Sequence, residues 1–291
     1  MSYVEASPLG ARARRRRILR RRFLRRPAAV VSLVVVVGAI LAAVLARWVA
    51  PYAPEQTDFD ALLAGPQREH LLGTDDLGRD TFSRIVWGAR ASIQAGFFAT
   101  VLAMALAIPI GLIAGYYRGW IDTVIARITD VLLAFPFLIL AVGLAAILGP
   151  SLLNATLALG IAAVPPLVRI ARGEALALRE EDYVRAAIAN GARDAVIIGR
   201  HILPNMASTL LVQATVTIPA AIIGEAVLSF LGLGVQPPLF TWGLMIAEAK
   251  NQLFFRPWLI AIPGAALVAL IFAINLLGDA VRDVTAPEGR A

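Results

Sequence analysis

The stretch RIARGEALALREEDYVRAAIANGARDAVIIGR, from Arg169 to Arg200, interrupts a chain that is otherwise mostly apolar. It leads directly into HILPN, which begins at His201. Its apolar residues recur at helical spacing, so the stretch has a face to present rather than being a passive connector. We interpret it as a helical loop between two membrane spans, with a surface for a separate protein on the cytoplasmic side.

The first helix of this loop is expected to begin at residues 180–182. These three residues are acidic, which suits the positive N-terminal end of a helix dipole. Tyr183 with Ala187, and Val184 with Ile188, are i, i+4 pairs that together give the helix an apolar edge. An amphipathic helix lying in lipid headgroups would show the same pattern, so the spacing alone does not identify the partner.

The helix is predicted to end at Gly191, where glycine tolerates a left-handed backbone. A second short helix over 192–200 then leads to Pro204, a residue suited to the first turn of the next span. Ala186 and Ala187 are small and would let another protein approach the backbone closely. The sequence therefore predicts an elbow of two helices joined at a glycine.

The rest of the composition is that of a membrane protein. The chain is 59% hydrophobic and 16% charged, whereas a soluble domain has about a quarter of its residues charged. A spanning helix needs about 20 apolar residues. Uncharged windows of that kind predict an all-α protein with six transmembrane helices, near 28–50, 92–116, 124–148, 152–172, 204–231 and 258–279.

The basic residues predict how the chain is oriented. Ten arginines lie between Arg12 and Arg26 and six more in the Arg169–Arg200 stretch, and basic short loops stay cytoplasmic. The apolar core of the first span is longer than a signal peptide's, so we interpret it as an anchor. The expected organisation is a basic cytoplasmic tail (1–26), a first span (27–50), an outer segment (51–91), a core of five spans (92–280) with a cytoplasmic loop (173–203), and a cytoplasmic tail (281–291).

The outer segment is expected to contain an amphipathic helix lying along the membrane interface. Phe82, Ile85, Val86 and Ala89 follow the i, i+3, i+4, i+7 pattern that predicts this helix.

The side chains of His70, Asp75, Asp76 and Asp80, in the same segment, are the candidates for a metal site. Their spacing matches no fixed ligand pattern, and capping or turn-forming aspartates are far commoner. We therefore expect no metal site there.

Few polar residues lie inside the spans. Glu225 and Asn275 could line a transport pathway or make structural hydrogen bonds, and Asp130 could pair with Arg127 on one helix. Prolines occur within five of the six spans, where they kink helices: Pro109, Pro136, Pro165 with Pro166, Pro219 and Pro263.

The sequence lacks the residues that several kinds of functional site require. The chain has no cysteine, which excludes disulfides and thiolate sites. Its only lysine, Lys250, follows alanine, so there is no Walker A motif for ATP. An intramembrane enzyme would need a nucleophile with a base, and the two histidines, His70 and His201, lie at membrane edges. The arginine run beside the first span indicates an anchor at the lipid surface rather than contact with nucleic acid.

The chain also resembles a known family in several motifs. Tyr183 to Ala187, Gly191 and the Ile202-Leu203-Pro204 run resemble the EAA loop of ABC-importer permeases, with Arg185 where the motif has glutamate. Between about residues 20 and 285, further motifs resemble the second permease subunit of the dipeptide/oligopeptide/nickel family: HLLGTD (70–75), LGRD (77–80), SFLGLGVQPP (229–238) and NLLGD (275–279).

The resemblance implies a type I ABC-importer permease fold with a cytoplasmic coupling helix, in the inner membrane of a prokaryote. It implies a second homologous permease subunit, two ATPases that use ATP and Mg²⁺, and an extracytoplasmic solute-binding protein; this chain would bind no cofactor itself. Tyr183, Ala186, Ala187, Gly191 and Pro204 would form the ATPase-coupling site, and the cargo would be a peptide. A secondary transporter or channel for small solutes is the alternative, although it would carry more buried charge or an internal repeat.

Overall fold

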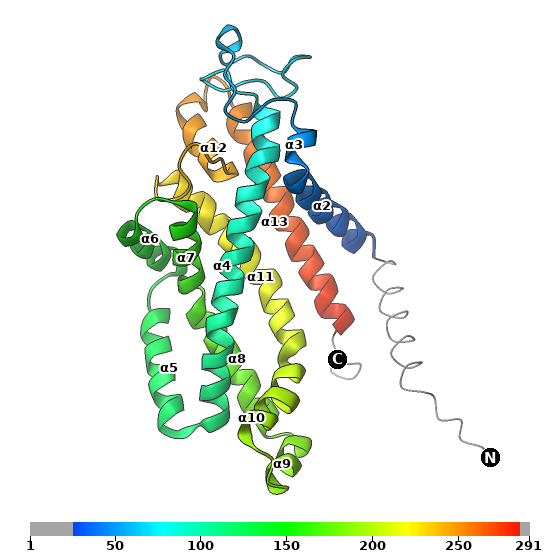
Figure 1. The fold of residues 1–291 in the computed structure, drawn as a ribbon, viewed down its shortest axis with the longest axis vertical. Coiled ribbons are helices and arrows are strands. Elements are labelled where there is room, and N and C mark those ends of the chain that lie inside the picture. Colours follow the sequence, from blue (N-terminus) through cyan, green and yellow to red (C-terminus); the bar gives the residue numbers. More distant parts are fainter. Residues whose placement is uncertain (1–25, 286–291) are drawn as a thin grey trace, which may run out of the picture.

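The computed structural model describes residues 26–285, which fold almost entirely into helices (Figure 1). The sole β interaction in this range is an isolated bridge between Thr74 and Asp80. In chain order the elements are α2 (Pro27–Val44), α3 (Ala46–Val49), η1 (Phe59–Ala61), α4 (Thr81–Tyr117), α5 (Gly119–Leu133), α6 (Phe137–Leu148), α7 (Leu152–Ala162), α8 (Val164–Arg179), α9 (Asp182–Ala189), α10 (Asp194–Val196), the π-helix η2 (Ile197–Ile202), α11 (Leu203–Phe230), α12 (Trp242–Ala249), η3 (Lys250–Gln252) and α13 (Trp258–Thr285).

Five helical segments are long and apolar enough to cross a bilayer. The pair α5 and α6, which meet at an angle of 88°, is a sixth candidate when the two helices are counted as one bent span. Counted in this way, the described residues contain the six predicted spans. The five continuous segments are Pro27–Val44, Thr81–Tyr117, Leu152–Arg179, Asp194–Phe230 and Trp258–Asp283.

The bend between α5 and α6 corrects the prediction of one helix over 124–148. Pro136 has no N–H to donate, and its ring would clash with the carbonyl of Leu132 in a continuing helix. Helix α5 therefore ends at Leu133, and Pro136 becomes the residue before the first turn of α6. Pro109, Pro219 and Pro263 lie inside unbroken helices, so proline alone did not predict which span would break.

Helix α4 corrects a second expectation. The predicted interfacial helix is the first part of α4, which runs without interruption for 37 residues, about 55 Å at 1.5 Å per residue. Asp80 caps this helix, because its Oδ2 accepts a hydrogen bond of 2.7 Å from the N–H of Ser83. The amphipathic pattern arose because Val86 and Ala89 pack into the protein, and the pattern did not require a helix lying along the membrane.

Close helix packing on α4 depends on small residues. A side chain at Gly111 would come within 2.6 Å of the Ala171 Cβ on α8, and one at Gly115 within 2.6 Å of the Arg172 carbonyl. The small-xxx-small spacing therefore lets α8 lie side by side with the C-terminal half of α4 (Figure 1).

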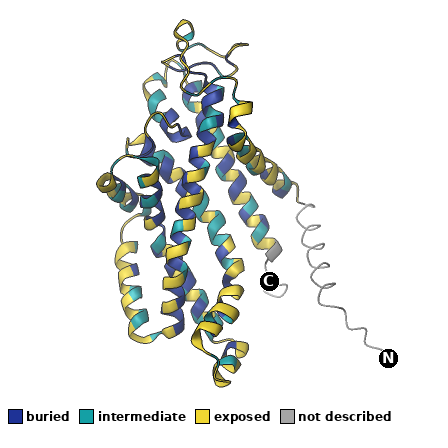
Figure 2. Cartoon of the chain, viewed as in Figure 1, coloured by how far each residue is buried: buried dark blue, intermediate teal, exposed yellow. Residues whose placement is uncertain are grey.

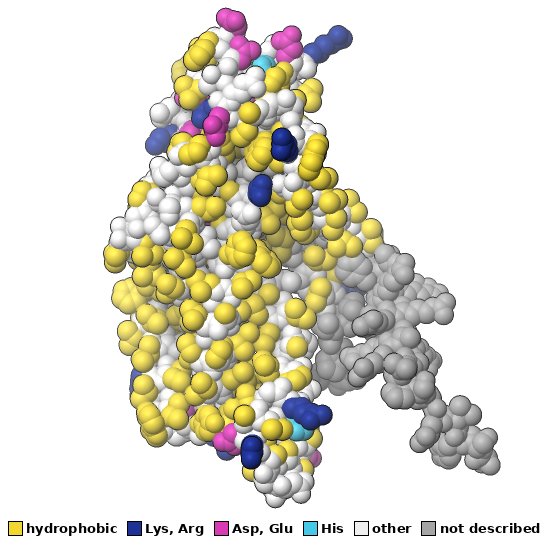
Figure 3. Space-filling model, viewed as in Figure 1, with side chains coloured by type: hydrophobic (Ala, Val, Ile, Leu, Met, Phe, Trp, Pro, Cys, Tyr) yellow, Lys and Arg dark blue, Asp and Glu magenta, His cyan; other side chains and the backbone are white. Residues whose placement is uncertain are grey.

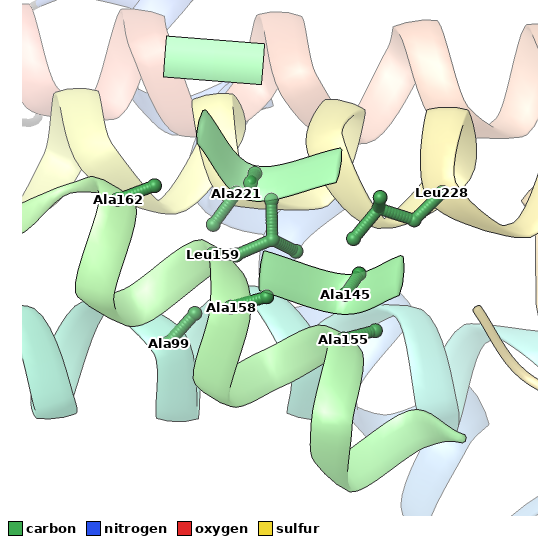
Figure 4. Packing of buried hydrophobic residues seen from close by; sticks show 9 residues of the cluster. Ala99, Ala145, Ala155, Ala158, Leu159, Ala162, Ala221 and Leu228 are labelled. Atoms are coloured by element: carbon green, nitrogen blue, oxygen red, sulfur yellow. The ribbon is translucent and has the colours of Figure 1, made fainter. Parts of the chain in front are cut away.

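Small residues also allow close helix packing in the core beside α7. Leu159 is fully buried and is surrounded mostly by alanines from α4, α6, α7 and α11 (Figure 4). A side chain at Gly224 would lie 2.3 Å from a methyl carbon of Leu159, so the buried Leu159 side chain would have to move to admit it. These contacts fix α7 between α4 and α11.

The outer surface of the bundle is apolar. Hydrophobic side chains form a broad band between the two ends, where the charged groups gather (Figure 3). Exposed positions predominate on α2 and α5 (Figure 2), and large side chains such as Val34, Trp120 and Ile128 are mostly exposed. A surface of this kind suits lipid or another membrane subunit.

The two ends of the described chain approach each other. Arg26, directly before α2, makes an ion pair with Asp283 near the end of α13. The rest of the predicted basic tail, including the other arginines of the 12–26 run, and the tail beyond residue 285 lie outside the described residues.

Candidate functional site

The end of the molecule opposite residues 51–80 carries the predicted elbow, which we define as residues 180–202 (Figure 1). Glu181 precedes the first turn of α9, and Asp182 lies within that turn. At the other end, Gly191 has a φ of +75°. Its N–H bonds to the Ile188 carbonyl, and the N–H of Ala192 bonds to the Ala187 carbonyl, at 2.9 and 3.1 Å. These two bonds form a Schellman cap, so the predicted left-handed end of the helix is confirmed.

The second helix of the elbow differs from the prediction of 192–200. It begins at Asp194, widens into a π-helix over Ile197–Ile202, and continues into α11. The N–H of Leu203 bonds to the carbonyl of Ile198, five residues back. Because Pro204 cannot donate and would press on the carbonyl of Arg200, a wider turn relieves the crowding just before it. Pro204 lies in the first turn of α11, as predicted.

Helix α9 has an inner and an outer face. Val184 is fully buried, in a cluster that includes Ile197, Ile202 and Met206. Ala187 is partly buried against this cluster. Val184 and Ile188, which were predicted to share one apolar edge, therefore have different surroundings. Val184 is buried, whereas Ile188 is 42% exposed.

Four of the five predicted docking residues are exposed. Tyr183 is 42% exposed, and Ala186, Gly191 and Pro204 are also exposed. Ala187 is the exception, since it is partly buried against the inner cluster. The structure therefore brings an exposed surface together at the elbow while packing its other side into the bundle.

Ion pairs attach the elbow to the spans. Glu180, at the end of α8, accepts hydrogen bonds from Arg118 at the end of α4 and from Arg185 on α9. The bond from Arg185, followed by the bond from Arg118, lowers the pKa of the Glu180 carboxyl to about 2. The Tyr116 hydroxyl on α4 donates to Asp194 of the elbow at 2.7 Å. Helix α4 is thus joined to both halves of the elbow.

These attachments were missed from the sequence. Glu180 was interpreted only as a helix-opening residue, and nothing near Tyr116 or Arg118 in the sequence indicates a partner. Arg118 lies 62 residues from Glu180, and Tyr116 lies 78 residues from Asp194. Pairs this distant in sequence are found only once the helices are packed.

Two further pairs join α8 to α5. Arg172 binds Asp122 with two hydrogen bonds, of which Nη2 to Oδ2 is 2.7 Å. Arg169 binds Asp130 at 2.6 Å. The pairing expected between Arg127 and Asp130 is therefore wrong, because α8 supplies the partner instead.

The opposite end of the molecule contains a mostly buried ion cluster, formed by Asp75, Arg79, Arg84 and Glu248. Asp75 Oδ1 also accepts from the backbone N–H of Arg79 at 2.9 Å. Arg84 lies over the ring of Phe240, 4.5 Å from its centre. The cluster ties the segment before α4 to α12.

The side chains weighed as metal ligands have other partners. His70 Nδ1 lies 3.0 Å from Asp80 Oδ1, and Asp80 also caps α4. Asp75 belongs to the ion cluster, whereas the Asp76 side chain is 52% exposed. Across the part of the chain that the structure describes, no group of three or more His, Asp or Glu residues is arranged to hold a metal ion.

The two polar residues weighed as pathway groups differ in position. Glu225 is fully buried and accepts a hydrogen bond of 2.6 Å from Ser229. The Ser229 hydroxyl in turn accepts from the N–H of Val235 at 3.2 Å, so the group joins α11 to the connection that follows it. Asn275 is exposed on α13. The contacts of Glu225 favour its structural role.

Comparison with known proteins identifies the family. Residues 107–288 match the family described as "binding-protein-dependent transport system inner membrane component", and residues 15–66 match the N-terminal TM domain of oligopeptide transport permease C. The chain is 43% identical over 260 residues to the dipeptide transport system permease protein DppC of Alkalihalophilus pseudofirmus, covering 89% of this chain and 86% of the relative.

A second relative is the glutathione transport system permease protein GsiD of Pectobacterium atrosepticum, 43% identical over 84% of this chain and 81% of its own. A chain of the inward-facing MetNI methionine ABC transporter has a TM-score of 0.56 and 21% identity, over 70% of this chain and 97% of its own. That likeness concerns the fold alone. The chain therefore belongs to the family of binding-protein-dependent inner membrane components and is a multi-pass permease subunit of an ABC importer.

Proposed function

We propose that this permease carries peptides and lines half of a translocation pathway, with a second homologous permease forming the other half. Both relatives described above are named for peptide cargo, a dipeptide and glutathione, and each aligns over more than four fifths of this chain. An extracytoplasmic solute-binding protein would deliver the peptide.

The observation that carries the coupling role is the two-sided elbow. Its inner side is packed through Val184 and held by Glu180, whereas Tyr183, Ala186 and Gly191 are exposed. A helix held firmly on one side and bare on the other suits insertion into a groove of another protein. We assign that groove to a cytoplasmic ATPase, with Pro204 at the edge of the contact.

Charge supports the orientation. Six arginines lie in the stretch from Arg169 to Arg200, at the end of the molecule that carries α9. Arg26 and Asp283 bring the two ends of the described residues together on the same side of the spans. By the positive-inside rule, the elbow and both termini would face the cytoplasm, and residues 51–80 would face outward.

Energy would come from two partner subunits that bind ATP and Mg²⁺. The sequence lacks the Gly-Lys-Ser/Thr of a P-loop, and Lys250 is its only lysine. Binding at the ATPases would shift the equilibrium between inward-open and outward-open states, and α9 would transmit that shift.

Co-purification tests this function. The tagged chain is expressed with its second permease, the two ATPases and the binding protein, then captured and reconstituted in liposomes. We expect the parent to retain the ATPases and to take up a dipeptide only with ATP. The Gly191→Val variant should lose the ATPases, because a β-branched residue resists a φ of +75°. Failure of the well-folded parent to capture an ATPase, or dipeptide uptake without ATP, would contradict the proposal.

A further inference from the structure

A hollow beside α4 lies apart from the coupling site and shares only Phe240 with the surroundings of the ion cluster. It has a volume of about 610 Å³ and lies between α4, the residues after α3, the start of α7 and the connection before α12. This volume falls within the range of about 300–1,000 Å³ that is usual for sites of small ligands. We call it the α4 hollow.

The wall of the α4 hollow combines apolar surface with three polar side chains. Trp87, Arg90, Ala91 and Gln94 line it from α4 at i, i+3, i+4 and i+7, which is one face of the helix. Leu152 and Phe240 contribute apolar surface from elsewhere in the chain, and Glu55 contributes a carboxylate.

The polar groups of the hollow are uncommitted. Glu55, Arg90 and Gln94 make no side-chain hydrogen bond or ion pair to any residue between 26 and 285. Arg79 and Arg84 also lie near the start of α4, yet both are bound to carboxylates. The guanidinium of Arg90, the carboxylate of Glu55 and the amide of Gln94 are therefore available to bind groups from outside these residues.

We propose that the α4 hollow contacts the peptide during transport, with Arg90 binding its carboxylate and Glu55 its ammonium group. A short peptide carries both charges and a backbone amide, which Gln94 can bind, while Trp87 can face its side chains. Guanidinium binds carboxylate with two parallel hydrogen bonds, which makes Arg90 selective for a free C-terminus. This inference rests on the proposed peptide-importing function.

Helix α4 connects the hollow to the elbow. Arg90 lies near its first third, and Tyr116, which bonds to Asp194, lies at its last turn. One unbroken helix thus carries both the peptide contact and the attachment of the coupling surface. A shift of α4 when the ATPases close would move the wall of the hollow as well.

The test uses the complete importer in liposomes, with its binding protein, second permease and ATPases. Uptake of alanyl-phenylalanine is compared with uptake of its C-terminal amide, in the parent, in Arg90→Ala and in Arg68→Ala. Arg68 is an exposed arginine of the same end of the molecule that does not line the hollow. The binding protein's own preference is common to all three, so the ratio between the peptides isolates the permease.

We expect Arg90→Ala to lower uptake of the free peptide by roughly tenfold or more, the loss typical of a hydrogen bond to a charged group, while the amide is little affected. Arg68→Ala should retain the parent ratio. Glu55→Gln should lower uptake of the free peptide relative to its N-acetyl form, with Glu69→Gln as the matched control.

An unchanged ratio in Arg90→Ala would overturn the inference, including the case in which both peptides lose uptake equally because the hollow receives the binding protein. Absence of ATP-driven peptide uptake in the parent would instead overturn the proposed function. The two failures are therefore distinguishable.

Discussion

The two ends of this permease use charge in opposite ways. At one end, Arg84 is 2% exposed and shares Asp75 and Glu248 with Arg79, so the cluster is part of the folded core. At the elbow, the side chains of Glu180 and Arg185 are about half exposed, and the pairs hold a helix against the bundle without burying it. Removing one member of a buried pair leaves an uncompensated charge, whereas an exposed pair contributes little to stability.

The largest loss of stability is expected from a substitution in the buried ion cluster. Arg84→Ala leaves Asp75 and Glu248 with one cation fewer and removes the contact with Phe240. We expect a loss of stability of about 3 kcal/mol, since breaking a buried pair leaves uncompensated charge. Thermal unfolding of the purified complex in detergent measures it. Arg68→Ala is the control, and an equal melting temperature for the two variants would refute the comparison.

Inside the elbow, packing should matter more than charge. Val184→Ala removes two methyl groups from a fully buried position, which should cost about 2 kcal/mol. We expect weaker protection of α9 and η2 in hydrogen exchange, together with weaker ATPase capture. If the amides of α9 exchange as slowly in Val184→Ala as in the parent, the packing of Val184 does not hold this helix in place.

The outer face of the same helix should affect coupling without affecting the fold. Ala186 is exposed, so tryptophan there finds space in the isolated chain but blocks a groove that accepts a small residue. We expect Ala186→Trp to reduce ATP-driven uptake roughly tenfold, corresponding to about 1.4 kcal/mol of lost docking. The melting temperature should remain that of the parent.

Ala186→Ser keeps the side chain small and should transport normally. Ala187→Trp should also uncouple transport, but it is a poorer test because Ala187 packs partly inward and the variant would disturb the fold. Normal uptake by Ala186→Trp would remove the outer face from the coupling site.

Sequence reasoning succeeded where the cause was local. Apolar windows located the spans, and Gly191 marked the end of α9 because only a left-handed residue closes that cap. It failed where the cause was tertiary. Nothing local distinguishes Pro136, which breaks its span, from Pro109, which does not.

The amphipathic pattern at the start of α4 failed for the same reason. The pattern correctly indicated that one face of the helix is covered. That face is covered by other parts of the protein and not, as had been expected, by the membrane interface. In the site, Ala186 and Gly191 are exposed as the sequence led us to expect, whereas Ala187 packs partly inward. The attachments through Tyr116 and Glu180 were not predictable, because their partners are distant in sequence.

The smallest change in stability is expected from breaking the exposed ion pairs of Glu180, and this change should depend on pH. The pKa of Glu180 is about 2 in the folded protein, below its ordinary value of 4.5, because Arg185 and Arg118 favour the carboxylate. A depressed pKa means that this contribution is present above about pH 4.5 and is lost as the pH falls toward 2. The attachment of the elbow should therefore weaken over that interval and be constant near neutral pH.

Glu180→Gln tests this dependence, because the amide does not titrate. Between about pH 5 and pH 2, the melting temperature of the parent should fall more steeply than that of Glu180→Gln. Both partners of Glu180 are exposed and screened by solvent, so the difference should be small and should shrink further in high salt. Parallel curves would mean that Glu180 does not hold the elbow, leaving its position to the packing of Val184 and the bond between Tyr116 and Asp194.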